Sequence, residues 1–120
     1  IIIMANTMTI SSGEENSVVG DTNHTYHLAC TIGDGQEHLF NTETKSVSLL
    51  YSSTDKYLGT IPVTIQADGT LVASSIPQES QSAGTFYLEL HEILNNGSTR
   101  IFPSEGHIEV YLNDSIASLQ

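Results

Sequence analysis

The sequence predicts an all-β fold: an antiparallel β-sandwich of about seven or eight strands, with an immunoglobulin-like topology preferred over a jelly roll. Three observations lead to this prediction. Apolar and polar residues alternate with a period of two in one segment after another, whereas no convincing run has helical spacing. Turn residues separate these segments at intervals typical of a sandwich, and Ser and Thr are abundant. No crossover helix is available to support a parallel sheet.

A chain of 120 residues is near the commonest size of a single domain, so one hydrophobic core is expected. Apolar residues make up 38% and charged residues 14%, which is typical of short half-buried strands joined by polar turns. We expect one sandwich domain at residues 8–115, after a tag or disordered N-terminus at residues 1–7. Met4 resembles a natural start, so Ile1 to Ile3 are left out of the fold prediction. Residues 116–120 are expected to begin a linker.

Two-residue alternation places most of the expected strands. From Thr25 to Ile32 the apolar side chains lie on one side and the polar ones on the other, which predicts a strand with one buried face. Similar segments are Ser46 to Tyr51, Phe86 to His91 and His107 to Leu112, with an extended segment from Tyr57 to Ile65 and a short first strand around Met8 and Ile10. The predicted common core consists of Tyr26, Leu28, Val47, Leu49, Phe86, Leu88, Leu90, Ile108 and Val110.

Turn residues separate the strands. The strongest hairpin signal is Asp68-Gly69 between two alternating arms. Further turns are expected at Gly33-Asp34-Gly35, at Asn95-Asn96-Gly97 and, as a short helical turn, within Gln78 to Ala83. The polar stretch from Gln36 to Lys45 is expected to cross between the sheets. Pro62 is confined to a sheet edge or a strand start, because proline has no N–H for the ladder.

The charge of the chain limits its partners. Lys45, Lys56 and Arg100 are the only basic residues, against fourteen carboxylates and a formal net charge of −11. Because such a surface repels phosphate, we expect neither nucleic acid nor an anionic membrane as a partner. No apolar stretch approaches the roughly 18 residues that a membrane helix needs. A metal ion, a cationic protein surface or a neutral surface remains open.

One strand face is the only metal hypothesis that the sequence offers. Its members share outward positions on two strands: Glu105, His107 and Glu109 on the last, and Glu89 and His91 on the preceding one. Carboxylates and imidazoles bind several divalent ions, but such side chains are also typical of a solvated face, which is the reading we prefer. His24 and His27 are three apart, so on a strand they would point to opposite faces and could not share an ion.

Enzyme chemistry is not expected. The sequence has no Gly-rich phosphate loop, nucleophile elbow or HExxH motif, and Cys30, its single cysteine, is predicted to be a small buried hydrophobe. No catalytic, cofactor-binding or metal-binding residue is therefore assigned. A sugar-binding module would have to stack its ligand on tyrosines, namely Tyr51, Tyr57, Tyr87 or Tyr111, because tryptophan is absent. Three glycosylation sequons, at Asn23, Asn96 and Asn113, carry little weight, because chance predicts about one or two in a chain so rich in Ser and Thr.

Strand and turn segments follow one another from about Thr22 to Ser115. They comprise Tyr26-His27-Leu28 to Ile32, Gly33-Asp34-Gly35, Val47-Ser48-Leu49-Leu50-Tyr51, Asp68-Gly69, Ser75-Ile76-Pro77, Gly84-Thr85-Phe86-Tyr87-Leu88-Glu89-Leu90, the Gly97 turn, Arg100, and Gly106-His107-Ile108-Glu109-Val110. In this order they resemble the N-terminal domain of the upper baseplate proteins of tailed phages of lactic-acid bacteria and related Gram-positive hosts.

This resemblance implies a non-enzymatic structural module of a phage tail baseplate, which anchors a larger receptor-binding assembly to the tail core. It implies other baseplate and tail proteins as partners, and a place in the virion after synthesis in the bacterial cytoplasm. The isolated domain is expected to be a monomer because its charge opposes self-association, whereas the parent protein would oligomerise through other segments. The alternative is a carbohydrate-binding or adhesin-type module of a bacterial surface protein.

Overall fold

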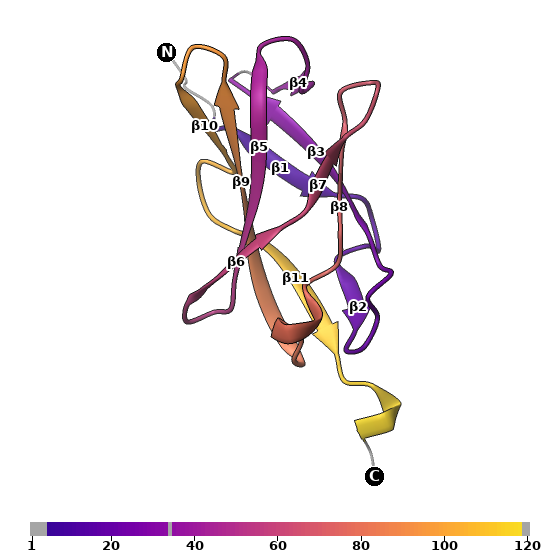
Figure 1. The fold of residues 1–120 in the computed structure, drawn as a ribbon. Coiled ribbons are helices and arrows are strands. Elements are labelled where there is room, and N and C mark those ends of the chain that lie inside the picture. The colour runs from indigo at the N-terminus through magenta and orange to yellow at the C-terminus, as the bar shows by residue number, and fades with distance from the viewer. Residues whose placement is uncertain (1–4, 34, 119–120) are drawn as a thin grey trace.

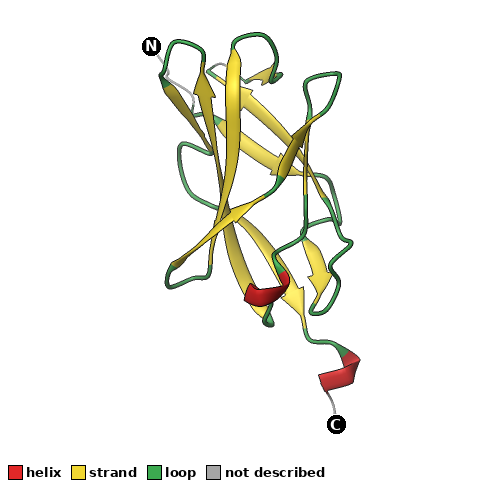
Figure 2. Cartoon of the chain, viewed as in Figure 1, coloured by secondary structure: helices red, strands yellow, loops and turns green. Residues whose placement is uncertain are grey.

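The computed structural model describes residues 5–33 and 35–118 and places two β-sheets face to face, as Figures 1 and 2 show. The predicted β-sandwich is therefore confirmed. The predictions made for Ile1 to Ile3 and for Asp34 concern residues outside those described. Thr7, expected to precede the domain, is the first residue of a strand and pairs with Thr31.

The first sheet has the order β1 (Thr7–Ile10), β3 (Tyr26–Ile32), β8 (Leu71–Ala73), β7 (Val63–Ile65), with β4 (Gln36–His38) also paired to β3. The second has the order β2 (Asn16–Val18), β11 (Ile108–Asn113), β9 (Gly84–Leu94), β5 (Thr44–Ser52), β6 (Tyr57–Ile61), with β10 (Thr99–Phe102) also paired to β9. The 3-10 helices are η1 (Gln78–Ser80), where a helical turn is expected, and η2 (Ile116–Ser118).

One pair of strands departs from the predicted antiparallel arrangement. β2 runs parallel to β11, with Asn16 opposite Tyr111, while the other described pairs are antiparallel. β2, β4 and β10 were not predicted, because three or four residues are too few for alternation to stand out.

The hydrophobic core lies between the two sheets. Its buried members are Met8, Tyr26, Leu28, Cys30, Phe40, Leu49, Tyr51, Ile61, Leu71, Ala73, Ile76, Phe86, Leu88, Leu90, Phe102, Val110 and Leu112. Of the predicted core, Val47 and Ile108 lie at the margin, partly buried against these residues. The alternation in β3 is as predicted, since His27 and Ala29 face solvent between buried neighbours. Cys30 is 2% exposed, which confirms it as a small buried hydrophobe.

Pro62 marks the place where the chain passes from one sheet to the other. The extended segment expected from Tyr57 to Ile65 is divided there, because β6 belongs to the second sheet and β7 to the first. Proline has no N–H to donate to a strand ladder, so β6 ends at Ile61 and β7 begins at Val63. Pro62 thus directly precedes a strand, in agreement with the expectation that it lies at an edge or a strand start. Its carbonyl accepts a hydrogen bond from the Ser74 N–H at 3.0 Å, which ties the crossing to the end of β8.

Burial affects two acidic groups of the core. Burial raises the pKa of the Cys30 thiol from 9.0 to about 12, and the charge of Glu92 adds to the shift. Burial likewise raises the pKa of the Tyr26 hydroxyl from 10.0 to about 12, with a further contribution from Asp21. Both groups therefore favour folding while protonated, and the unfolded chain loses these protons at lower pH than the folded chain.

We expect the stability to fall at alkaline pH, beginning near the unfolded pKa of the thiol and continuing toward the folded values of about 12. Urea unfolding should show a falling midpoint between about pH 8 and about pH 11, with a smaller fall in Cys30→Ala. A Cys30→Ala protein with the same alkaline profile as the unchanged protein would contradict the role of the thiol.

The β7–β8 hairpin confirms the strongest turn signal of the sequence. The Gln66 N–H donates to the Thr70 carbonyl at 2.8 Å, and the Gly69 N–H donates to the Gln66 carbonyl at 2.9 Å. The Asp68 carboxylate accepts hydrogen bonds from the backbone and hydroxyl of Thr70. Gly69 has a φ of 86°, a left-handed conformation that costs little only for glycine. A Cβ at this position would lie 2.9 Å from the Cβ of Leu39.

Gly69→Ala should destabilise the protein by about 1–2 kcal/mol, through the left-handed backbone and the contact with Leu39 together. Gly13→Ala is a matched control, because Gly13 has a similar φ of 89° but nothing within 4 Å of a Cβ. Chemical denaturation of both variants separates the two causes. Equal losses in both would show that the contact with Leu39 contributes nothing.

Candidate functional site

A pocket of about 170 Å³ lies on the outer face of the second sheet. It is lined by residues from β5, β6 and β9 and from the segment before β11, among them Leu50, Ser52, Tyr57, Tyr87, Glu89 and His107. Three strands of the sheet and the loop before a fourth thus contribute to one hollow. The side chains combine aromatic rings, a carboxylate, a hydroxyl and an aliphatic group.

The strand register explains why these side chains meet. Leu49 is buried, so Leu50 points to the opposite, outer face, where it lies across from Glu89 of β9. Ser52 lies across from Tyr87 on one side and from Tyr57 on the other. The register between β5 and β6 shifts between Tyr51 and Ser52. This irregularity brings Tyr57 into line with the outer face.

The aromatic residues differ in their availability. Tyr57 is 61% exposed. The ring of Tyr87 stacks on His107 with centroids 4.5 Å apart and an interplanar angle of 22°. Tyr111 is exposed, and its hydroxyl donates to Glu109 Oε2 at 3.2 Å. Tyr51, in contrast, belongs to the core, and its hydroxyl is 2.7 Å from Ser80 Oγ. The sequence allowed Tyr51 as a stacking surface, but its burial excludes that role.

The five possible metal ligands share the outer face only in part, because Glu105 and His107 precede β11 rather than lie on it. The imidazole Nε2 of His91 is 2.7 Å from Glu89 Oε2, whereas His107 stacks on Tyr87 and Glu109 accepts the Tyr111 hydroxyl. Within residues 5–33 and 35–118, no group of three or more such side chains could hold a metal ion.

His24 and His27 both contact Glu14, the residue that holds the β1–β2 connection against β3. The ring Nε2 of His24 is 2.7 Å from the Glu14 carbonyl, and the ring Nδ1 of His27 is 2.7 Å from Glu14 Oε2. Burial alone would raise the pKa of the Glu14 carboxyl, but hydrogen bonds from the backbone and ring of His27 outweigh it and lower the pKa. The two imidazoles thus support a loop.

Adding zinc or calcium should leave the melting temperature nearly unchanged, because the carboxylates and imidazoles of the outer face are engaged in separate pairs. Differential scanning fluorimetry with increasing metal tests this expectation. A saturable rise of several degrees that is lost in His107→Ala would establish a metal site on this face.

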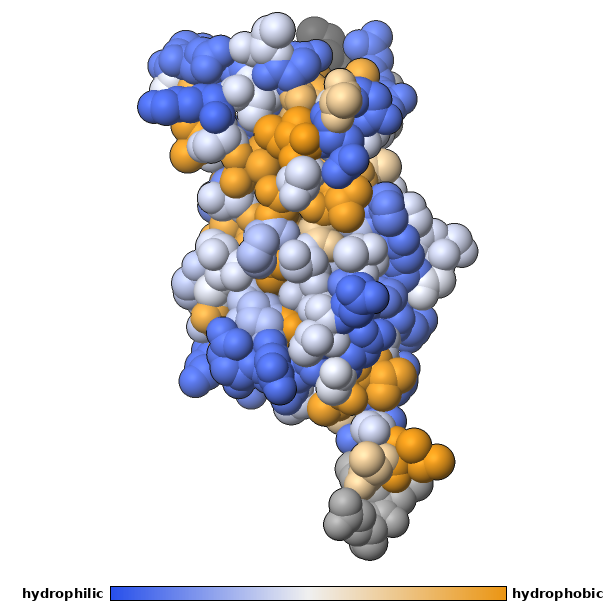
Figure 3. Space-filling view, turned by 45° about the vertical axis from the view of Figure 1, so that its right-hand side comes forward, coloured by the Kyte–Doolittle hydropathy of each residue, from blue (hydrophilic) through white to orange (hydrophobic). Residues whose placement is uncertain are grey.

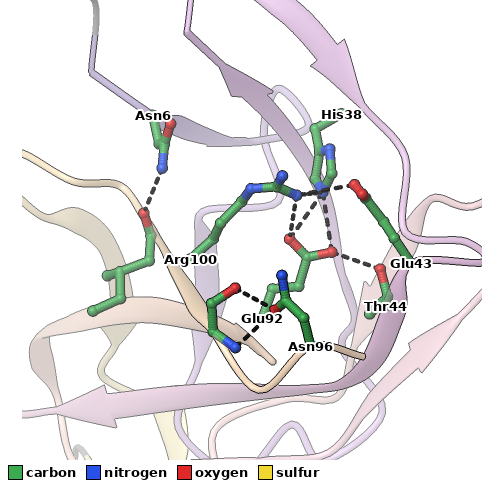
Figure 4. A network of polar contacts seen from close by, with 9 residues as sticks. Asn6, His38, Glu43, Thr44, Glu92, Asn96 and Arg100 are labelled. Atoms are coloured by element: carbon green, nitrogen blue, oxygen red, sulfur yellow. Dashed lines mark hydrogen bonds and ion pairs between the residues drawn. The ribbon is translucent and has the colours of Figure 1, made fainter. Parts of the chain in front are cut away.

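A cluster of polar side chains around Glu92 is buried at the margin of the core, on the other side of the sheet from the pocket (Figure 4). The Glu92 side chain is 0% exposed, and its carboxylate lies 2.9 and 3.1 Å from the Nε2 of His38. The Thr44 hydroxyl donates to Glu92 Oε2 at 2.5 Å, and Arg100 Nη1 donates to Glu92 Oε1 at 3.3 Å. Arg100 also donates to Glu43 Oε1 at 3.1 Å. The buried carboxylate is thereby surrounded by donors.

The cluster is part of the packed interior of the sandwich. His38 stacks on Phe102 and meets Phe40 edge to face, so its ring is part of the core. Burial would lower the pKa of Arg100, but Glu43 and Glu92 raise it, which keeps the guanidinium charged. This cluster was not predicted, although Glu92 continues the inward positions of Leu88 and Leu90. A carboxylate at an inward strand position must be buried, and a buried carboxylate requires hydrogen-bond partners. The inward position of Glu92 was therefore the sequence signal for a buried polar cluster.

Apolar side chains also reach the surface away from the pocket. Figure 3 shows apolar surface mainly in the upper half of that view, with a smaller apolar group at the lower end toward the C-terminal segment. Near the β7–β8 hairpin, the exposed apolar residues are Leu39, beside Gly69, and Ile65 of β7. They are 38% and 40% exposed.

No protein-family model matches the chain, and no curated protein is significantly similar to it. Among the described residues, no helix is long and apolar enough to cross a membrane.

Proposed function

We propose that the chain is a non-enzymatic structural module of a phage tail baseplate, which anchors a larger receptor-binding assembly to the tail core. Its partners are other baseplate and tail proteins, and its place is the virion. We also assign an immunoglobulin-like topology. In support, the order β1-β3-β8-β7 corresponds to strands A, B, E and D of that fold, and β11-β9-β5-β6 to strands G, F, C and C′.

The observation that carries the docking role is the aromatic pocket on the outer sheet face. Exposed tyrosines beside a hollow are typical anchors of protein interfaces, because a large ring buries much surface at a low cost in side-chain entropy. Tyr57 is the most exposed tyrosine of the pocket. The net charge of −11 opposes association between copies of the chain, which directs the face toward a different partner.

Co-purification with the tail and baseplate proteins encoded beside this gene tests the proposal. We expect one of them to be retained, and Tyr57→Ser to weaken its binding by about tenfold or more. Ile65→Ser is the matched control, because it removes a similarly exposed apolar side chain from the other sheet. Retention of none of these proteins, together with micromolar affinity for a defined glycan, would overturn the baseplate role.

A carbohydrate-binding or adhesin-type module is the second candidate, and one observation favours it. Tyr57 and Tyr87 line the same shallow pocket as the Ser52 hydroxyl and the Glu89 carboxylate. Aromatic rings beside such polar groups are suited to stack on a sugar ring and hydrogen-bond its hydroxyls. A glycan array distinguishes this candidate from the first, since the baseplate role predicts no glycan binding by this domain.

A further inference from the structure

We propose that the outer-face pocket binds a cationic side chain of the partner protein, and that the preferred group is the guanidinium of an arginine. The inference deepens the proposed docking function and rests on it. It assigns a chemical class of ligand to a site lined by Tyr57, Tyr87 and Glu89.

Aromatic rings give the pocket its first attraction for such a group. A planar guanidinium stacks on tyrosine and gains a cation–π attraction that an amide or a hydroxyl does not. Tyr57 offers a ring that is 61% exposed, and the half-buried Tyr87 forms part of the wall. The aliphatic Leu50 completes an apolar lining suited to the methylene stem of the arginine.

The carboxylate of Glu89 supplies the second attraction. His91 contacts its Oε2 at 2.7 Å, and no described residue hydrogen-bonds to its Oε1. The Glu89 side chain is 49% exposed, so an incoming donor can reach the free oxygen. Arginine donors match carboxylate oxygens better than the single point charge of lysine does.

The overall charge of the chain favours a cation over an anionic ligand. Lys56, directly before Tyr57 in the chain, is the basic residue that would oppose a cation there, and the adjacent Asp55 carboxylate offsets its charge. The net charge of −11 attracts cations toward the surface and repels phosphate and carboxylate ligands. A neutral sugar gains nothing from this field, and we therefore favour the cation.

A pair of small probes tests this inference on the intact chain. N-acetyl-arginine amide carries the charge, and N-acetyl-citrulline amide is its neutral analogue of nearly the same shape. In an NMR titration we expect arginine to cause saturable shifts at Leu50, Tyr57, Tyr87 and Glu89, with a Kd on the order of millimolar. Citrulline should bind at least about tenfold more weakly, and added salt should weaken arginine binding.

Two variants and a control locate the site. Glu89→Gln keeps the size of the side chain but removes its charge, and Tyr57→Leu removes the ring; each should weaken arginine binding by about fivefold or more. Glu37→Gln makes the same charge change on β4 of the other sheet and should leave binding unchanged. Equal binding of the two probes, or an equal loss in all three variants, would overturn the inference. Saturable binding of a neutral oligosaccharide at these residues in place of arginine would also overturn it.

The same variants separate this inference from the docking function. If a tail protein binds the unchanged chain and binds Glu89→Gln and Tyr57→Leu equally well, the baseplate role stands, whereas docking through this pocket and the arginine inference both fail. If arginine binds the pocket but no tail protein is retained, the baseplate role fails while the ligand chemistry stands.

Discussion

Replacing Glu92 by alanine should lower the free energy of unfolding by about 3–5 kcal/mol, because removing one member of a buried ion pair leaves its partners desolvated and unpaired. His38 and Thr44 would lose the Glu92 carboxylate inside the core, and Arg100 would keep the exposed Glu43 and a contact of 3.4 Å with His38 Nε2. Urea unfolding measured by circular dichroism gives the loss directly.

Two further variants identify the origin of that loss. Glu92→Gln retains the volume of the side chain, so a loss of more than half the alanine value would attribute the effect to charge and hydrogen bonding rather than to a cavity. Glu43→Gln removes the exposed partner of Arg100 and should cost less than about 1 kcal/mol. A Glu92→Ala protein within about 1 kcal/mol of the unchanged one would show that the cluster does not stabilise the fold.

Replacing Leu88 by alanine should cost about 2–5 kcal/mol, because the side chain is 1% exposed at the centre of the sandwich and its removal leaves a cavity. Glu89→Ala, the next position on β9, changes an outward side chain and should cost less than about 0.5 kcal/mol. A one-residue shift of β9 would exchange these two results. Chemical denaturation of the pair therefore tests the strand register.

Local sequence pattern predicted the long strands but not their partners. β3 and β9 are each long enough for alternation to assign the buried face, and Asp68-Gly69 fixed the hairpin. β10 has four residues, and its place beside β9 depends on contacts that no local pattern contains. The pairing of His38 with Glu92 joins residues 54 positions apart, so it follows from the assembled sheets rather than from either segment.

The candidate site could be predicted only in part, for a related reason. Tyr87, Glu89 and His107 were expected on outward faces of neighbouring strands, and all three line the pocket. Tyr57 reaches the same pocket because of the register shift between Tyr51 and Ser52, which the sequence does not reveal. Tyr51 has the opposite orientation, since it follows Leu49 on the inward side of β5.

The parallel pairing of β2 with β11 determines how the domain would bear mechanical load. The N-terminal and C-terminal parts of the chain lie at opposite ends of the sandwich (Figure 1), so tension between them would draw these two strands in opposite directions along their axes. The hydrogen bonds between them, which include those from Val19 N–H to the Asn113 carbonyl and from Tyr111 N–H to the Glu15 carbonyl, would then be sheared together rather than opened one by one. A domain joined in this way resists extension, because its forced unfolding depends on one large barrier instead of a series of small ones.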